Sequence, residues 1–165
     1  MSKNSNFTDY WPLASFILVA VLAGSAVCYG VNGETLQWMH YVMGFLFCQF
    51  SLLKLFNISD FADGFQMYDL IAKRSRIYAL TYPCIELILG LAYLAFFVPI
   101  IIYLVTIVLM LIGSIGVVIA LQKGLDIYCP CMGTILKVPL STVTLTEDLG
   151  MGAMALIMLI SRLLY

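Results

Sequence analysis

Two cysteines separated by one proline are the residues of this chain best suited to chemistry. Cys129, Pro130 and Cys131 stand two residues before Gly133, in the longest polar stretch between apolar segments. A Cys-x-Cys pair can form a strained small-ring disulfide, and strain makes a disulfide easier to reduce. Pro130 stiffens the turn, and Gly133 permits a positive φ beyond it. The motif indicates thiol redox chemistry or binding of a soft metal such as Cu(I) or Zn, against the plain alternative of two unreactive thiols.

Cys84 is the natural third thiol of such a site. It follows Tyr82 and Pro83 near the start of an apolar segment, on the side of the membrane to which the topology below assigns the Cys-Pro-Cys motif. Three thiols suit either a disulfide that shuffles through a resolving cysteine or a three-sulfur metal site. Taken alone, Cys84 is equally consistent with a small apolar filler. Cys28 and Cys48 are interpreted as packing residues, and the odd total of five cysteines excludes a fully paired framework within one chain.

Two charged residues are expected inside the membrane. Glu86 lies within an apolar segment, where a carboxylate is a functional candidate by default. Two residues of helix turn through about 200°, so Glu86 points away from Cys84. Lys54 is the expected partner of Glu86, either in a structural ion pair or in a proton relay. His40, the only histidine, is assigned a role at the opposite membrane interface.

The composition predicts an integral membrane protein that must position these residues. Hydrophobic residues make up 63% of the 165 residues and charged residues 10%, against roughly 45–50% and about 25% in soluble domains. A net charge of −1 provides no basic field for nucleic acid. We predict one all-α membrane domain over residues 1–165, a polytopic bundle of four to five transmembrane helices. The expected spans are residues 12–29, 38–56, 77–97, 99–121 and 146–165, with the Cys-Pro-Cys loop at 122–145.

A sixth helix is predicted over residues 58–73. Ile58, Phe61, Phe65, Tyr68 and Ala72 recur at helical spacing with charged residues between them, which is typical of an amphipathic helix on the membrane surface. The plain alternative is an ordinary polar loop. For the last span, Thr144 and Glu147 have the spacing of a capping box, which predicts a helix start near residue 146.

The distribution of basic residues predicts the orientation. The second and fourth loops and their flanks carry the basic residues Lys54, Lys73, Arg74, Arg76, Lys123 and Lys137. The positive-inside rule then places the N-terminus and the Cys-Pro-Cys loop in the cytoplasm, and the protein in the inner (cytoplasmic) membrane.

Several blocks together resemble the MauE branch of the DoxX/MauE membrane family, named from methylamine utilisation. The matching blocks are Gly64-Phe65-Gln66-Met67-Tyr68-Asp69-Leu70, Ala72-Lys73-Arg74-Ser75, Tyr82-Pro83-Cys84-Ile85-Glu86-Leu87 with Leu89-Gly90, Cys129-Pro130-Cys131-Met132-Gly133, and Val138-Pro139-Leu140-Ser141 with Glu147-Asp148. The resemblance covers roughly residues 41–159. It implies a four- or five-helix membrane protein associated with thiol redox, linked to maturation of a disulfide-rich dehydrogenase beside a thioredoxin-like partner.

We therefore expect a membrane thiol–disulfide oxidoreductase or redox accessory protein, in which Cys129 and Cys131 form the redox pair and Cys84 relays or resolves. It would exchange electrons or disulfides with a thioredoxin- or glutaredoxin-like partner and need no cofactor beyond that disulfide. Disulfide delivery to an exported enzyme favours thiols outside, whereas the charge bias places them inside. The alternatives are a soft-metal transporter or relay with Cu, Hg or Zn on the same three cysteines, and a non-catalytic assembly subunit.

Overall fold

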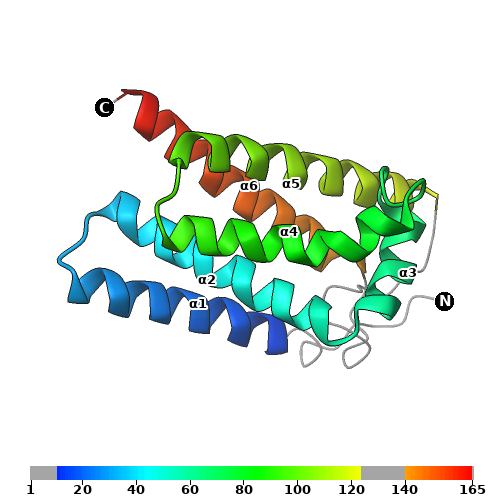
Figure 1. Cartoon of the computed structure of the whole chain (residues 1–165), viewed down its shortest axis with the longest axis horizontal. Coiled ribbons are helices and arrows are strands. Elements are labelled where there is room, and N and C mark those ends of the chain that lie inside the picture. Colours follow the sequence, from blue (N-terminus) through cyan, green and yellow to red (C-terminus); the bar gives the residue numbers. More distant parts are fainter. Residues whose placement is uncertain (1–10, 124–139, 165) are drawn as a thin grey trace.

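The chain is built from helices that run alongside one another. The computed structural model describes residues 11–123 and 140–164, and its described part contains no β-strand. The helices are α1 (Trp11–Gly30), α2 (Thr35–Phe56), α3 (Ile58–Tyr68), α4 (Arg76–Leu94), α5 (Pro99–Gln122) and α6 (Leu140–Leu164). Five of them follow the long axis of the bundle, while the short α3 sits at one end (Figure 1). The predicted all-α membrane bundle is confirmed.

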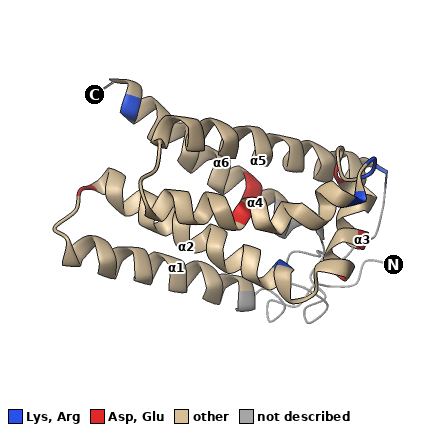
Figure 2. Ribbon diagram, viewed as in Figure 1, with Lys and Arg blue, Asp and Glu red and all other residues tan. Residues whose placement is uncertain are grey.

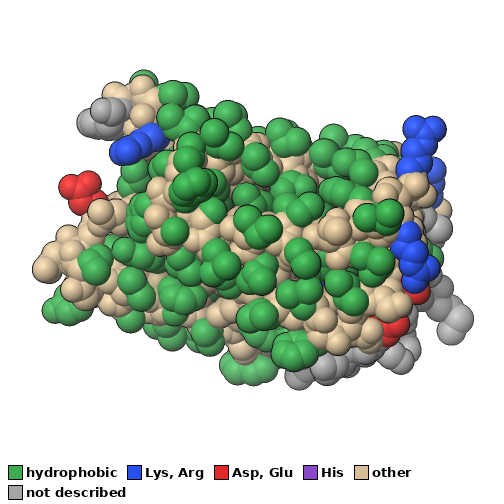
Figure 3. All heavy atoms as spheres, viewed as in Figure 1, with side chains coloured by type: hydrophobic (Ala, Val, Ile, Leu, Met, Phe, Trp, Pro, Cys, Tyr) green, Lys and Arg blue, Asp and Glu red, His purple; other side chains and the backbone are tan. Residues whose placement is uncertain are grey.

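The outer surface of the bundle is apolar enough for lipid. Segments of α1, α2, α4 and α5 are long and apolar enough to cross a bilayer: Leu13–Gly30, Thr35–Phe56, Arg76–Leu94 and Pro99–Gln122. Their outward faces expose large apolar side chains, among them Leu18 (58%), Ile88 (66%) and Leu111 (54%). Figure 3 shows such side chains covering the middle of the visible face, with charged side chains at its two ends. Because water would penalise this surface, lipid must cover it, and the protein is a multi-pass membrane protein.

The hairpin between the third and fourth spans forms where the sequence predicts it. Helix α4 ends at Leu94, and Pro99 is the first residue of α5. Between them, Phe96 and Val98 adopt positive φ angles of 53° and 37°, which reverse the chain in four residues. Pro99 suits its place because the missing N–H would have no helical acceptor in a first turn.

Helix α3 is amphipathic, but its apolar face meets protein rather than lipid. Phe61, Phe65 and Tyr68 are buried with Tyr82 of α4 and Val117 of α5 in one apolar cluster. The apolar face of α3 is therefore covered by protein rather than by lipid, while the helix itself lies at one end of the bundle (Figure 1). Its position on the membrane surface stays a prediction. The helical periodicity was sound, since it requires only an apolar partner, and a neighbouring helix supplies one as well as lipid does.

Helix α3 also ends at Tyr68, whereas the prediction extended it to residue 73. The Oδ1 atom of Asp69 accepts hydrogen bonds from the backbone N–H groups of Ile71 (2.9 Å) and Ala72 (2.7 Å). An aspartate that satisfies the following backbone donors in this way competes with the helix and favours a turn. Ser75 then caps α4, its hydroxyl accepting from the backbone N–H of Tyr78 at 3.3 Å.

Helix α6 begins at Leu140, six residues before the predicted start of the last span. Thr144 and Glu147 therefore lie inside the helix, and the predicted capping box does not form its start. The helix is antiparallel to α5 and packs along it (Figure 1). This register places Glu147 and Asp148 about two turns from the start of α6. The predicted start at residue 146 would place them in its first turn.

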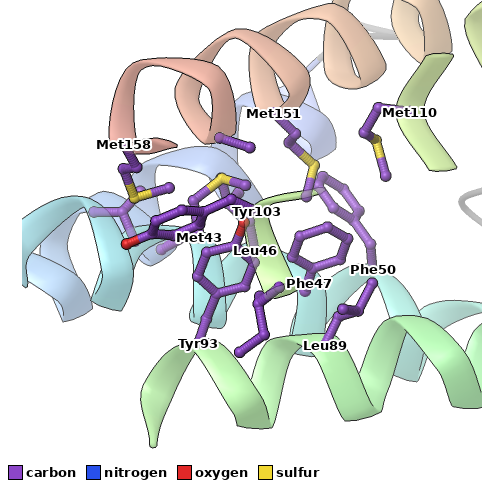
Figure 4. Packing of buried hydrophobic residues seen from close by; sticks show 14 residues of the cluster. Met43, Leu46, Phe47, Phe50, Leu89, Tyr93, Tyr103, Met110, Met151 and Met158 are labelled. Carbon is purple, nitrogen blue, oxygen red and sulfur yellow. The ribbon is translucent and has the colours of Figure 1, made fainter. Parts of the chain in front are cut away.

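The centre of the bundle is filled by aromatic and methionine side chains. Phe47 and Tyr93 stack with ring centroids 5.8 Å apart, and Met43, Met110, Met151 and Met158 close the gaps around them (Figure 4). Methionine suits such irregular spaces because it is unbranched and flexible. Helices α2 and α4 approach closely at Gly44 and Gly90, where the absence of side chains brings their backbones together.

The two ends of the bundle differ in charge. The end that carries α3 holds Lys73, Arg74 and Arg76, with Lys123 closing α5, whereas Arg162 lies near the opposite end of α6 (Figure 2). This is the asymmetry on which the predicted orientation rests.

Candidate functional site

A buried ion pair joins α2 to α4 at the α3 end of the bundle. The Nζ atom of Lys54 lies 2.6 Å from each carboxylate oxygen of Glu86. Lys54 is 7% exposed and Glu86 4%, so water screens the pair very little. The sequence predicts this pairing, and the structure brings the two residues together. A buried pair of this kind needs good geometry and further partners to offset the loss of hydration.

Aromatic rings provide part of that compensation. The Lys54 ammonium lies over the ring of Phe61 at 5.5 Å and over that of Tyr82 at 5.2 Å, measured to the ring centroids. Cations are attracted to the face of an aromatic ring, more strongly where water is excluded. Phe61 belongs to α3, so the short helix at the end of the bundle also contributes to this charged site.

A proline lies one turn before Glu86 in α4. Pro83 lies inside α4 and has no N–H, so the carbonyl of Ala79 loses its helical donor there. The hydroxyl of Ser51 on α2 donates to the carbonyl of Pro83 at 2.6 Å. This bond ties α2 to α4 one turn from the ion pair and fixes the facing surfaces of the two helices.

A small cavity adjoins the pair and receives side chains from five helices. Its volume is about 30 Å³. Besides Lys54 and Glu86 it is lined by Tyr68 and by two acidic residues of α6, Glu147 and Asp148. We did not predict a site role for Tyr68, Glu147 or Asp148. A usable signal exists, since Glu147 and Asp148 are two adjacent acidic residues at the start of an apolar segment, but the predicted helix start placed them at the membrane surface.

Asp69 is a second buried carboxylate, just outside the membrane-spanning helices. It is 1% exposed, and burial raises its pKa above the usual value of 3.8, although two backbone hydrogen bonds and Lys73 act in the opposite direction. The Cα of Asp69 and the carbonyl of Tyr68 press against Gly116 of α5. A Cβ at residue 116 would stand 2.8 Å from that carbonyl, so only glycine lets this turn close over the bundle.

Cys84 projects from the face of α4 opposite to that of Glu86. Its thiol is free and the residue is exposed, as are Ile77, Thr81 and Ile88 along the same outward stripe of the helix. It therefore does not act as a filler of the protein core, and it faces away from Glu86 as the sequence predicts. Cys28 is buried and Cys48 half-buried, which agrees with their interpretation as packing residues.

The other predicted site residues, Cys129, Pro130, Cys131 and Gly133, lie outside the described residues. Their role stays a prediction, as does the three-cysteine site that includes Cys84. Within residues 11–123 and 140–164, no three His, Cys, Asp or Glu side chains are arranged to hold a metal ion.

His40 lies inside the bundle near the end opposite to α3. Its Nδ1–H donates to the carbonyl of Tyr93 at 3.2 Å, and its Nε2 accepts from the hydroxyl of Tyr103. Phe96 stacks on the ring with centroids 4.4 Å apart. The sequence placed His40 at the membrane interface, whereas the structure buries it in a polar cluster between α2, α4 and α5, and it is far along the bundle from Cys84.

Comparison with protein families identifies the chain over nearly its whole length. Residues 13–161 match the family described as "Methylamine utilisation protein MauE". The chain belongs to the MauE family. Comparisons with curated proteins and with solved structures found no match. The resemblance noted from the Tyr82–Leu87 and Cys129–Gly133 blocks is thus confirmed.

Family membership and structure together define this MauE-family protein at a coarse level. It is a multi-pass membrane protein of the methylamine utilisation family. Among the described residues, Cys84 lies on the outer face of α4 and the Lys54–Glu86 pair on its inner face.

Proposed function

We propose that this MauE-family protein is a membrane thiol–disulfide redox protein. Cys129 and Cys131 would form the reactive pair, and Cys84 the relay or resolving thiol. The observation that carries the proposal is the exposure of Cys84 on a face of α4 that the bundle leaves open. A thiol that serves only packing is normally buried within the protein, whereas Cys84 lies on the outward, lipid-facing side of α4, about two turns from the α3 end of that helix.

The position of Cys84 along the bundle supports the proposal. Counting from Arg76, eight residues of helix carry Cys84 about 12 Å into the bundle from the α3 end. Helix α5 ends at Gln122 at this same end, and α6 starts there (Figure 1). Cys129 follows Lys123 by six residues, which gives an extended reach of about 20 Å. The chain is therefore long enough for the Cys-Pro-Cys motif to meet Cys84.

The proposed reaction is a thiol–disulfide exchange with a thioredoxin- or glutaredoxin-like partner. The thiolate of one cysteine of the pair attacks the partner's disulfide and forms a mixed disulfide. The second cysteine then attacks that bond, so the Cys129–Cys131 disulfide forms while the partner leaves as a dithiol, having gained two electrons and two protons. The Cys84 thiolate can attack the new disulfide, forming a disulfide with Cys129 or Cys131 and releasing the other as a thiol. Two thiols of a client protein then reduce that disulfide and become a disulfide themselves, and the reverse direction follows the same steps.

The orientation belongs to the same proposal. We place the α3 end, with Lys73, Arg74 and Arg76, in the cytoplasm and the protein in the inner membrane. The partner would then approach the basic end of the bundle from the cytoplasm, where it is kept reduced, and donate electrons to the Cys129–Cys131 disulfide, which is the reverse direction of the exchange above.

Trapping the mixed disulfide tests this function. A Cys131→Ser variant and a Cys129→Ser variant, each in lipid nanodiscs, are mixed with a thioredoxin-like protein whose resolving cysteine is serine and whose remaining cysteine is activated as a mixed disulfide with an aromatic thiol, which leaves when the membrane protein's thiolate attacks. We expect one of the two variants to form a covalent adduct that a reductant dissolves, and Cys48→Ser, as the matched control, to behave as the parent protein does.

Two outcomes would overturn the redox proposal. The first is that neither variant forms an adduct and the five thiols remain free at every redox poise. The second is that the reduced protein binds a stoichiometric amount of Cu(I), Zn or Hg(II), which is lost when Cys129 or Cys131 becomes serine. That second result would establish the soft-metal alternative.

A further inference from the structure

The cavity beside the Lys54–Glu86 pair carries more acid than base. Of the described residues that line it, Lys54 is the only basic one, whereas Glu86, Glu147 and Asp148 are acidic. Lys54 neutralises Glu86 through two contacts of 2.6 Å. A further ionised carboxylate in a site with so little water is strongly disfavoured unless a proton or another cation joins it.

The surroundings of the cavity add no second cation. The charged lining residues are Lys54 of α2, Glu86 of α4, and Glu147 and Asp148 of α6. The uncharged lining residues are Phe47 and Phe50 of α2, Phe61, Phe65 and Tyr68 of α3, Tyr82 of α4, Met110 and Gly113 of α5, and Met151 of α6. The tyrosines are neutral hydroxyl groups and the remaining neighbours are apolar. The excess negative charge therefore falls on α6.

Asp148 is directed at the backbone of α5. If residue 113 carried a Cβ, that atom would stand 2.8 Å from Oδ2 of Asp148, so Gly113 makes room for the carboxyl group. The neighbouring residue Glu147 has interactions of its own. Asp148 thus lies against α5 and lines the same cavity as Lys54 and Glu86.

We propose that this cavity is a proton-binding site, in which Asp148 holds an exchangeable proton beside the Lys54–Glu86 ion pair. Its volume of about 30 Å³ accommodates about two water molecules, at roughly 10–15 Å³ each. When the proton leaves, the carboxyl O–H bond breaks, the carboxylate remains on Asp148, and a cavity water carries the proton away. This inference does not depend on Cys84.

A proton fits this site better than a metal ion does. The described His, Cys, Asp and Glu residues form no group of three that could hold a metal, so the carboxylates do not converge as metal ligands would. A hard cation such as Mg²⁺ also retains several waters, for which the cavity has no room. A proton needs only one carboxyl oxygen and a water to carry it.

Infrared spectroscopy of the full chain in nanodiscs tests the proposal. Near neutral pH, we expect the C=O stretching band of a protonated carboxylic acid, which shifts in heavy water and is lost in strongly alkaline buffer. Labelling aspartate with heavy carbon in the otherwise unchanged protein should shift this band, because it belongs to an aspartate. The labelling experiment requires no variant to fold.

Variants then assign the band to one residue. Asp148→Asn should abolish it, whereas Asp63→Asn, at an exposed carboxylate paired with Arg76, should leave it intact. Asp69→Asn separates the contribution of the other buried aspartate. Absence of a protonated carboxyl band near neutral pH, a band unmoved by labelled aspartate, or a band that survives Asp148→Asn would each overturn the proposal.

Discussion

Lys54 on α2 and Glu86 on α4 form a buried contact in which one ammonium nitrogen lies 2.6 Å from both carboxylate oxygens. The ammonium also lies over the rings of Phe61 of α3 and Tyr82 of α4. This contact joins the two helices directly beneath the short helix α3. It thereby links the amphipathic segment at the bundle end to the charged interior.

Breaking the pair from one side should destabilise the protein. In Lys54→Met, the carboxyl group of Glu86 loses its counter-charge inside the bundle, which costs about 3–5 kcal/mol in comparable pairs. Replacing both residues, as Lys54→Met with Glu86→Leu, should recover most of the loss because no charge is left buried. The measurement is the free energy of unfolding in detergent micelles.

The exposed pair of Arg76 with Asp63 provides the control for that experiment. Both of its side chains are 57% exposed and the contact is 3.0 Å, so Arg76→Gln should cost less than about 1 kcal/mol. If Lys54→Met is as harmless as Arg76→Gln, the buried pair does not hold α2 to α4.

The stability of the protein should depend on the ionisation of Asp69. Because burial raises the pKa of this carboxyl in the folded protein, the folded state retains its proton at higher pH than the unfolded state does. Its contribution to stability therefore falls as the pH rises from about 4 through the folded pKa, and then stays level. Asp69→Asn should remove this dependence, which thermal unfolding across the acid-to-neutral range would detect.

A second substitution at the same position separates charge from hydrogen bonding. Asn keeps an oxygen that can accept from Ile71 and Ala72, whereas Asp69→Ala leaves both backbone donors without their partner and should cost about 1–3 kcal/mol. Parallel pH profiles for the parent protein and Asp69→Asn would contradict the assignment.

The close approach of α2 and α4 should not tolerate a methyl group at Gly90. A Cβ there would stand 2.8 Å from Sγ of Cys48 and 3.0 Å from both the backbone nitrogen of Cys48 and the carbonyl oxygen of Gly44. Gly90→Ala should therefore cost about 1–3 kcal/mol, as other overpacked cores do. The melting temperature in detergent is a sufficient readout.

Gly150→Ala is the matched control for Gly90→Ala. Gly150 lies in α6 with nothing within 4 Å of an added Cβ. The better helix propensity of alanine should make this change neutral or stabilising by up to about 1 kcal/mol. Equal effects at the two glycines would show that helix propensity, and not the α2–α4 contact, determines the result.

The three described cysteines should differ in reactivity. A membrane-permeant maleimide should modify Cys84 first, because Cys84 is exposed on the outer face of α4 whereas Cys28 is buried and Cys48 half-buried. Rates are compared in variants that retain one of the three cysteines, with Cys129 and Cys131 replaced by serine. Faster labelling of Cys28 on α1 than of Cys84 on α4 would contradict this prediction.

The sequence predicts the helices well because the length of an apolar run, and the prolines and polar residues that end it, are local properties of the chain. Lys54 and Glu86 could be paired in advance, since two opposite charges in apolar segments near one membrane face have few other partners. The hairpin at Phe97-Val98-Pro99 followed from the conformational limits of proline.

The features that could not be predicted are those that depend on how the helices pack against one another. The stripe of Phe61, Phe65 and Tyr68 fits lipid and protein equally, and only the placement of α3 on α4 and α5 decides between them. The site role of Asp148 was missed because Thr144 and Glu147 suggested a helix start beside it. The true start at Leu140 carries Asp148 into the bundle, opposite Gly113.

Counting free thiols together with bound metal on one purified sample tests the redox function most directly. The chain has five cysteines. The redox account predicts two fewer free thiols before reduction than after it, with no bound thiophilic metal in either state, and loss of that difference when Cys129 or Cys131 becomes serine. Five free thiols in both states, or metal bound in proportion to protein, would contradict it.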